Sequence, residues 1–151
     1  MRIQSSSVYL LLTLTFISFF SCDLSVKGSD NILLKPWIGP FEGVPAFDLV
    51  EVKDVEEAML TAMSAHLEEI EIIANDMTPP TFENTIVAME RSGTVLERAY
   101  AYYGVLSRNE SSPEFRATQK KLAPYFADYR SKITQNERLF KRIATIYENS
   151  K

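Results

Sequence analysis

The sequence predicts an all-α protein, an antiparallel helical bundle of three or four helices preceded by a signal peptide and an irregular aromatic arm. Apolar residues recur at steps of three and four along three successive stretches of the 151-residue chain, which is the spacing of one buried helix face. Proline-containing breaks at Pro79-Pro80 and near Pro113 separate these stretches, and proline marks helix ends and starts. Three apolar stripes must bury one another, so the helices should pack together through short connections.

Composition and charge limit the classes of function. Apolar residues make up 46% of the chain and charged residues 24%, as in ordinary soluble globular proteins. The formal net charge is −4 and no run of Lys and Arg occurs. Because phosphate binding depends on clustered basic side chains, we expect no nucleic-acid partner.

Residues 1–21 have the pattern of a secretory signal peptide. Arg2 gives the segment a basic start, and residues 8–20 form an apolar run. This run of 13 residues is shorter than the roughly 20 residues that a membrane-spanning helix needs. The segment is therefore expected to direct export rather than to span a membrane permanently.

Cys22, the only cysteine, directly follows Ser21 at the end of the apolar run. This placement resembles a bacterial lipoprotein signal, in which the cysteine thiol receives a diacylglyceryl group and becomes the first residue after cleavage. The resemblance predicts lipid attachment at Cys22 and a place in the bacterial cell envelope, anchored to a membrane on its periplasmic or surface side. Phe19 stands where the lipoprotein pattern usually has leucine, so ordinary secretion and a chance cysteine in an uncleaved segment remain alternatives.

Residues 22–53 should form a tether and an irregular arm. Glycine and proline are scattered through this segment without a sustained period, which disfavours a regular helix or strand. Trp37, Phe41 and Phe47 punctuate it, and large aromatic side chains usually fix such a segment to a neighbouring surface.

The helical bundle should occupy residues 54–151, with a first helix that starts near Asp54. Asp54 can cap the free backbone amides, and Glu57 is placed to complete a capping box. Asn75, Asp76 and the following prolines should end this helix. Its apolar face is predicted to carry Val55, Met59, Ala62, Met63, His66, Ile70, Ile73 and Ala74.

The second helix should begin after Thr81, a good N-cap residue. Its apolar residues follow a heptad pattern. They are Phe82, Ile86, Met89, Gly93, Leu96, Tyr100 and Tyr103. Gly93 lies on this face, where its missing side chain permits close approach of a neighbouring helix at a cost of about 1 kcal/mol in helix propensity.

The third stretch should be capped by Ser112, with Pro113 at the first helical position, where its missing amide is not needed. Pro124 should kink this stretch or divide it in two. A second heptad pattern runs along it and is interrupted at Asn136. Its members are Phe115, Leu122, Phe126, Tyr129, Ile133, Phe140, Ile143 and Tyr147.

The chain lacks the residue patterns of a catalytic or metal site. A zinc peptidase uses H-E-x-x-H to bring two imidazoles and a carboxylate together, whereas the only histidine here stands in His66-Leu67-Glu68-Glu69-Ile70. A lone histidine on an apolar helix face is typical of a structural residue. We therefore assign no catalytic residue and no metal ligand, and expect this chain to bind no metal and to be inactive alone.

Two further groups of residues have both a functional and a structural interpretation. Glu68, Glu69 and Glu71 could suggest an acidic cluster, but consecutive helical positions point apart, which favours a solvated face. The tyrosines could line a peptide groove, although packing in the bundle core or at its edge is favoured. These are Tyr100, Tyr102, Tyr103, Tyr125 and Tyr129.

Several segments together resemble the amino-terminal region of the thimet oligopeptidase family, in its bacterial peptidyl-dipeptidase and oligopeptidase A branch. The most specific are PTFENTIVAMERSG (residues 80–93) and KITQNERLFKR (residues 132–142), in this order. The others are LKPWIGPFEGVPAFDLV (residues 34–50), YGV (103–105), SPEF (112–115) and LAP (122–124). The similarity covers nearly all of the chain after Cys22.

The resemblance implies an all-α zinc metallopeptidase that cleaves short peptides in a deep channel between two halves. The amino-terminal helices of such an enzyme form one wall of the channel, and its zinc helix lies far downstream. This chain would then be the amino-terminal wall of an exported oligopeptidase or peptidyl-dipeptidase, with zinc, short peptides and the catalytic half as properties of the complete enzyme.

Two alternatives remain open at this point: a stand-alone lipoprotein whose bundle binds a peptide or partner, and a split enzyme whose catalytic half is a separate chain. If the chain is a fragment, it should expose apolar surface that a missing half would cover. Trp37, Tyr102 and several residues of the heptad patterns are expected to be uncovered in that case.

Overall fold

A computed structural model describes residues 30–40, 43–110 and 112–151. Cys22, Phe41 and the predicted signal peptide lie outside these residues. The described chain is helical, apart from an isolated antiparallel bridge between Ile38 and Val44. Its elements in order are the 3-10 helices η1 (Ile32–Leu34) and η2 (Phe47–Leu49), the helix α1 (Val52–Ala74), the π-helix η3 (Phe82–Val87), and the helices α2 (Ala88–Arg91), α3 (Thr94–Asn109), α4 (Pro113–Thr134) and α5 (Glu137–Asn149).

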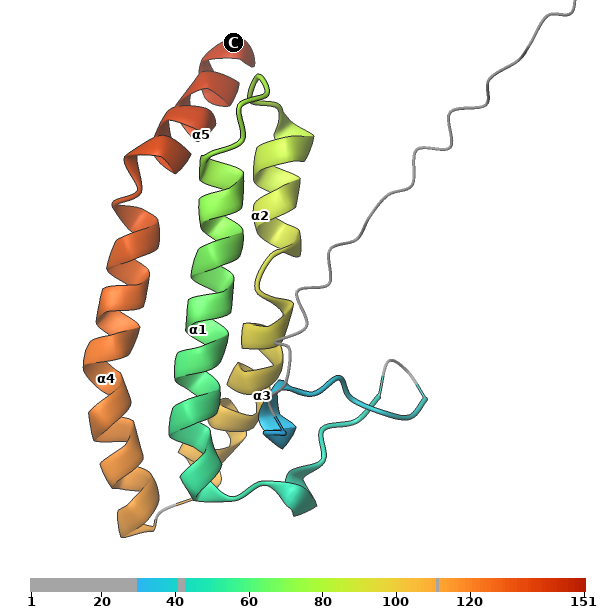
Figure 1. Cartoon of the computed structure of the whole chain (residues 1–151), viewed down its shortest axis with the longest axis vertical. Helices are drawn as coiled ribbons and strands as arrows, with labels where there is room; N and C mark the ends of the chain where they lie inside the picture. Colours follow the sequence, from blue (N-terminus) through green and yellow to red (C-terminus); the bar gives the residue numbers. More distant parts are fainter. Residues whose placement is uncertain (1–29, 41–42, 111) are drawn as a thin grey trace, which may run out of the picture.

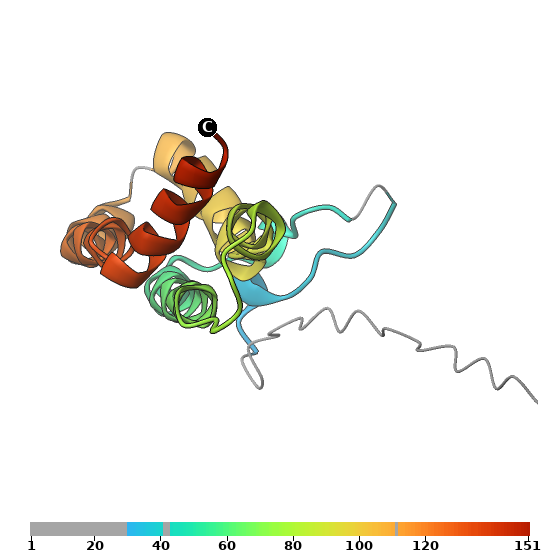
Figure 2. The same cartoon turned by 90° about the horizontal axis from the view of Figure 1, so that it is seen from above.

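The helices form three legs that run up, down and up (Figure 1). The first leg is α1, the second consists of η3, α2 and α3, and the third consists of α4 and α5. Consecutive legs are antiparallel, so α1 and α4 lie parallel to each other, while α5 turns away from α4 and crosses the end of the bundle (Figure 2). The predicted all-α class is confirmed for the described residues.

The helix α1 begins at Val52, two residues before the predicted start, and Glu51 occupies the N-cap position without a side-chain hydrogen bond. Asp54 lies in the first turn rather than at the cap, so the predicted capping box does not form. An acidic side chain in the first turn still stabilises the helix, because it lies near the positive end of the helix dipole. The end of α1 at Ala74 and its buried face agree with the prediction.

The second leg starts as predicted and then departs from one continuous helix. Thr81 and Asn84 form a reciprocal capping box, in which Thr81 Oγ1 accepts from the Asn84 amide at 3.1 Å and the Thr81 amide donates to Asn84 Oδ1 at 2.8 Å. Ser92 is extended and Gly93 is left-handed, with φ of +82°, so the helix breaks between α2 and α3. Gly93 therefore interrupts the predicted helix.

This break changes which side chains face the core. The heptad pattern predicted Leu96, Tyr100 and Tyr103 on the inner face, but α3 buries Val95, Leu96, Ala99 and Tyr102. Leu96 is buried as predicted, whereas Tyr100 and Tyr103 are only partly buried at the edge of the core. A non-helical residue rotates the helix that follows, so the buried face of α3 only partly matches the predicted pattern. Phe82, which precedes the break, is 63% exposed.

The third leg is also broken, but not at the proline where the sequence predicts the break. Ser112 caps α4 by accepting from the Phe115 amide at 3.1 Å, and Pro113 is the first helical residue, as predicted. The helix continues through Pro124, so the predicted division does not occur there. It occurs instead at Gln135 and Asn136, before α5.

Beyond this second break the buried face is again displaced by one residue. Leu139 and Arg142 are buried in α5, whereas the predicted Phe140 and Tyr147 are exposed. Leu139 packs with Ile70, Ile73 and Ala74 of α1 in a small second cluster. The main core lies between α1, α3, α4 and η1.

Described residues before α1 pack against α3, which η1 also contacts. The hydroxyl oxygen of Tyr102 accepts from the Ala46 amide at 2.9 Å, and the rings of Trp37 and Phe47 lie 6.4 and 5.1 Å from the Tyr102 ring. Tyr102 is only 1% exposed. The expectation that Tyr102 would be uncovered is therefore wrong, because the segment before α1 supplies its cover.

Candidate functional site

The described residues contain no group of three or more His, Cys, Asp and Glu side chains that could hold a metal ion. His66 lies where the three legs meet, and its ring is half-buried. The Tyr129 hydroxyl of α4 lies 2.5 Å from His66 Nδ1, and Ser92 Oγ lies 2.9 Å from His66 Nε2. Both ring nitrogens are thus used in contacts within the protein.

The hydrogen-bond pattern fixes the tautomer of His66. Ser92 Oγ donates its only hydrogen to the Met89 carbonyl at 2.7 Å. It must therefore accept from His66 Nε2–H, which leaves Nδ1 of the neutral ring to accept from the Tyr129 hydroxyl. His66 joins α1 to α4 and to the break between α2 and α3, which is a structural arrangement.

Burial shifts the pKa values of both members of this pair. It lowers the pKa of His66 from its ordinary value of 6.5, against weaker opposing effects of Glu69 and Glu97. It also raises the pKa of Tyr129 to about 12. Both shifts favour the neutral forms, so at neutral pH His66 is held as the uncharged partner of Tyr129.

The acidic residues of α1 do not form one cluster. Glu68 is exposed, while Glu69 is half-buried and accepts from the Gly93 amide at 2.5 Å. Glu71 is exposed and contacts Asn136 and Arg138 at 2.9 and 3.0 Å. The solvated face predicted for these residues is correct for Glu68 and Glu71, whereas Glu69 stabilises the backbone of the break before α3.

The five tyrosines do not line a common groove. Tyr102 packs against Trp37 and Phe47, whereas Tyr100 and Tyr103 pack against Phe126 at ring distances of 5.8 and 5.4 Å. The Tyr129 hydroxyl is hydrogen-bonded to His66, and Tyr125 is 51% exposed. The predicted packing role is confirmed for four of these rings.

The largest polar network surrounds Arg142, which is 6% exposed. The guanidinium has five N–H donors, and five contacts use them. Nη1 donates to the Asp76 and Thr78 carbonyls at 2.5 and 3.2 Å. Nη2 donates to Asp76 Oδ2 and Asn84 Oδ1 at 3.2 and 2.9 Å, and Nε donates to Thr85 Oγ1 at 3.2 Å.

This network joins the two segments that carried the family resemblance. Asn84 and Thr85 belong to residues 80–93, and Arg142 ends residues 132–142. Asn84 also donates from its side-chain amide to Thr78 Oγ1 and to the Pro79 carbonyl, both at 3.0 Å. Sequence reasoning missed the site because an arginine on a helix is normally expected in solvent.

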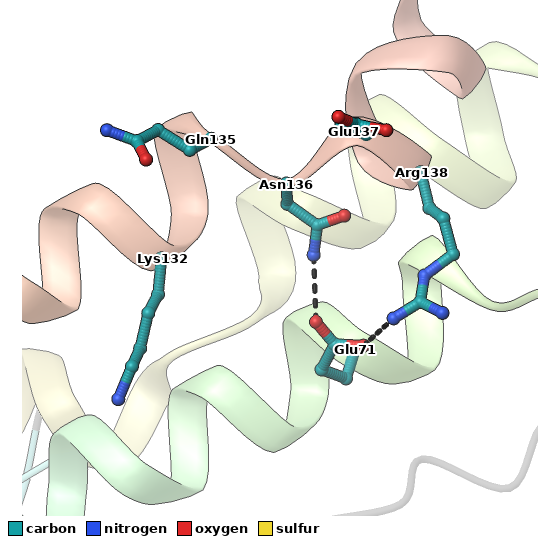
Figure 3. A pocket seen from close by; sticks show the side chains of 6 residues that line it. All are labelled: Glu71, Lys132, Gln135, Asn136, Glu137 and Arg138. Atoms are coloured by element: carbon teal, nitrogen blue, oxygen red, sulfur yellow. Dashed lines mark hydrogen bonds and ion pairs between the residues drawn. The ribbon is translucent and has the colours of Figure 1, made fainter.

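A shallow pocket of about 350 Å³ lies where α4 meets α5. Figure 3 shows Glu71 between Asn136 and Arg138, while Lys132 and Gln135 line the opposite side. Its charged groups are largely paired, since Glu71 holds Arg138 and Lys132 forms an ion pair with Asp128 at 2.8 Å. This arrangement leaves little unbalanced charge to select a ligand.

Several large apolar side chains are exposed, and two pairs of them are relevant to the proposals below. Ile38 and Val44 stand out from the bundle before η2, and Phe140 and Tyr147 lie along α5. Among the described residues, no helix has the length and apolar character to span a bilayer. The described part of the chain thus combines buried polar contacts with exposed apolar surface.

No protein-family model matches the chain. Individual curated proteins do. The chain is 26% identical over 120 residues to a dipeptidyl carboxypeptidase of Salmonella typhimurium, covering 80% of this chain and 18% of that protein. It is 27% identical over 109 residues to oligopeptidase A of Escherichia coli, covering 72% of this chain and 16% of the relative.

A dipeptidyl carboxypeptidase of Escherichia coli gives a third match, 26% identical over 104 residues. These matches confirm the resemblance drawn from the segments at residues 80–93 and 132–142. The chain spans less than a fifth of the length of each of these relatives. Over most of its length, the chain is thus similar in sequence to a part of the dipeptidyl carboxypeptidases and of oligopeptidase A.

Proposed function

We propose that this chain is the amino-terminal helical wall of a peptidase of this family, whose complete form hydrolyses short peptides. The observation that carries the proposal is the match over as much as 80% of this chain to proteins whose names denote peptide cleavage. The structure supports a wall rather than a reaction centre, since the most buried polar groups, Arg142 and Thr85, bond to each other and to the backbone.

Zinc would supply an activated water to the complete enzyme. The described residues do not fit a zinc site, because His66 uses both ring nitrogens and no group of three or more His, Cys, Asp and Glu side chains among them could hold a metal ion. No step of peptide hydrolysis is therefore assigned to them. The purified chain should hold no stoichiometric zinc. One tightly bound zinc per chain, lost on His66→Ala, would contradict this expectation.

The proposal extends to the location of the protein. Residues 1–21 direct export, and a lipid on Cys22 holds the chain to a membrane of the cell envelope. Replacing the thiol by Cys22→Ser should release the protein from the membrane fraction or leave the precursor uncleaved. Ser21→Ala keeps a small residue at this point and serves as the control. Unchanged membrane association of Cys22→Ser would refute the lipid anchor.

A stand-alone binding module is the second candidate. It is favoured by the packing of the described helices, in which Tyr102 is covered by Trp37 and Phe47 and all five N–H groups of Arg142 are hydrogen-bonded. On this view the chain needs no catalytic half. It would bind a peptide or protein partner by itself.

A chimera separates the two candidates. Residues 30–151 would replace the matching region of Escherichia coli oligopeptidase A, and cleavage of a short peptide would be measured alongside calorimetric binding of the same peptide to the chain alone. Retained cleavage by the chimera, with no binding by the chain alone, supports the wall. Tight peptide binding by the chain alone, with an inactive chimera, supports the module.

A further inference from the structure

An apolar pair stands out from the bundle in the segment between η1 and η2. Ile38 and Val44 form the isolated bridge, in which the Val44 amide donates to the Ile38 carbonyl at 3.4 Å. Their exposed fractions are 89% and 64%. Figures 1 and 2 show this segment extending away from the helices, on the side of the molecule opposite α4. No described side chain of the bundle covers the pair.

The base of this segment is fixed, so the pair has a defined position. Gly43 has φ of +94°, and a Cβ atom there would lie 2.5 Å from the backbone of Trp37. On the side towards the bundle, Trp37 and Phe47 pack on Tyr102 of α3, and the Ala46 amide donates to the Tyr102 hydroxyl oxygen. The aromatic residues thus face the bundle while Ile38 and Val44 face outward.

The point where the chain enters the described structure lies close to this segment. Asp30 is eight residues after Cys22, a length that spans at most about 29 Å even when fully extended. η1, which follows Asp30, packs on α1 and α3 beside the outward segment (Figure 1). A lipid on Cys22 would therefore keep Ile38 and Val44 near the surface of the same bilayer.

We propose that Ile38 and Val44 insert into the interfacial layer of the membrane that holds Cys22, and so set the orientation of the bundle on that membrane. The inference rests on the lipid attachment proposed above. Two side chains are too few for a stable protein interface, which buries about 1,000 Å² or more. They suffice as a second contact beside a lipid chain, since stable membrane binding commonly combines two such signals.

The negative charge of the chain indicates that the contact of Ile38 and Val44 with the membrane is apolar and not electrostatic. The chain from Cys22 onward lacks Arg2 and carries a formal net charge of −5, from 15 basic and 20 acidic side chains. It gains little from anionic phosphates, so insertion should depend on apolar contact. Binding of the pair should therefore persist in zwitterionic phosphatidylcholine vesicles and at high salt, conditions that weaken electrostatic attachment.

The test uses the full lipoprotein, purified with its acyl groups and reconstituted into phosphatidylcholine vesicles. Acylation blocks Cys22, so a thiol introduced by Val44→Cys can be labelled with an environment-sensitive fluorophore. Met77→Cys is the matched control, because Met77 is 96% exposed in the connection at the far end of α1. The Val44 fluorophore should be blue-shifted and quenched by lipid-borne quenchers, whereas the Met77 fluorophore should remain in water.

A second variant checks the role of the apolar pair itself. Ile38→Asp with Val44→Asp should reduce quenching of Trp37, the only tryptophan, by brominated lipids at least severalfold while leaving helical circular dichroism unchanged. An acylated chain whose Val44 fluorophore stays as aqueous as that at Met77 overturns the membrane contact and leaves the anchor intact. Mass spectra without acyl groups overturn the anchor, and the contact with it.

Discussion

At the scale of single residues, the described structure places its strongest polar contacts at Arg142 and His66, and both serve packing. Arg142 binds the connection between α1 and η3 through Asp76 and Thr78 as well as η3 itself through Asn84 and Thr85. His66 binds Tyr129 and Ser92. Each side chain links parts of the chain that are far apart in sequence.

Replacing the buried guanidinium should be costly. Arg142→Lys keeps the charge but cannot reproduce a planar fork with five donors, so several buried acceptors lose their partners. The free energy of unfolding should fall by about 2 to 4 kcal/mol, measured by urea denaturation. Arg138→Lys changes a surface ion pair whose arginine is 62% exposed and should cost less than about 0.5 kcal/mol. Equal effects of the two substitutions would contradict the network.

The His66 contact should make stability depend on mildly acidic pH. Because the folded-state pKa of His66 lies below its ordinary value of 6.5, the unfolded chain takes up the proton first. Stability should therefore be unaffected above about pH 7 and should fall as the pH drops through 6.5 towards the folded pKa. Urea denaturation at a series of pH values measures this, and the dependence should vanish in His66→Asn.

Protonation of Asp76 should cause a separate loss of stability at lower pH. The pKa of Asp76 is lowered from 3.8, chiefly by the Thr78 amide and then by the Thr78 hydroxyl, with a smaller effect of Arg142. Its contribution is present above pH 4 and is lost as the pH falls through the folded value. The loss due to Asp76 thus begins at a lower pH than the loss due to His66, and the His66→Asn variant separates the two effects.

At the scale of elements, caps and breaks decide how each leg of the bundle runs. Thr81 and Ser112 start helices where the sequence predicts them. The breaks at Gly93 and at Asn136 then set the orientation of α3 and α5. At Gly93, the His66 ring lies 3.2 Å from the place of a Cβ atom, so the close approach predicted for this glycine is confirmed although the helix is interrupted.

Two glycines of the second leg should respond to alanine in opposite directions. Gly93→Ala forces a Cβ into a left-handed conformation and against His66, which should lower the free energy of unfolding by about 1 to 3 kcal/mol. Gly104 lies inside α3 with nothing within 4 Å of the added Cβ. Gly104→Ala should therefore raise stability by about 0.5 to 1 kcal/mol. Thermal denaturation followed by circular dichroism measures both, and stabilisation by Gly93→Ala would contradict the assigned break.

At the scale of the whole molecule, the described bundle has its own core but leaves apolar surface outside it. Phe140 and Tyr147 are 68% and 63% exposed and lie seven residues apart, on one face of α5. Such surface commonly marks an interface. It is also consistent with the proposed wall of a larger peptidase, whose other parts would cover it.

The α5 surface should make the separated chain associate. Residues 22–151 should form concentration-dependent oligomers in sedimentation velocity, and Phe140→Glu with Tyr147→Glu should weaken them at least severalfold without loss of helicity. Tyr125→Glu, at a tyrosine that is 51% exposed on α4, is the control and should have little effect. A monomer at high concentration with a sharp, high-temperature transition would instead favour the stand-alone binding module.

The sequence by itself determined the helical class, the buried face of α1, the caps at Thr81 and Ser112, and the similarity to dipeptidyl carboxypeptidases and oligopeptidase A. These features depend on neighbouring residues or on motifs, so they can be recognised without knowing what lies across the bundle. The signal peptide and the lipid on Cys22 are likewise predictions from local pattern, and they concern residues outside the described structure.

Only the tertiary structure decided which side chains after each break are buried and what the lone histidine and Arg142 do. One extended or left-handed residue rotates the following helix, so Ala99 and Leu139 are the buried residues, while Tyr100 is only partly buried against the core and Phe140 is exposed. The partners of Arg142 lie 57 to 66 residues away. Burial of a charged side chain depends on contacts at that separation, and no local pattern encodes them.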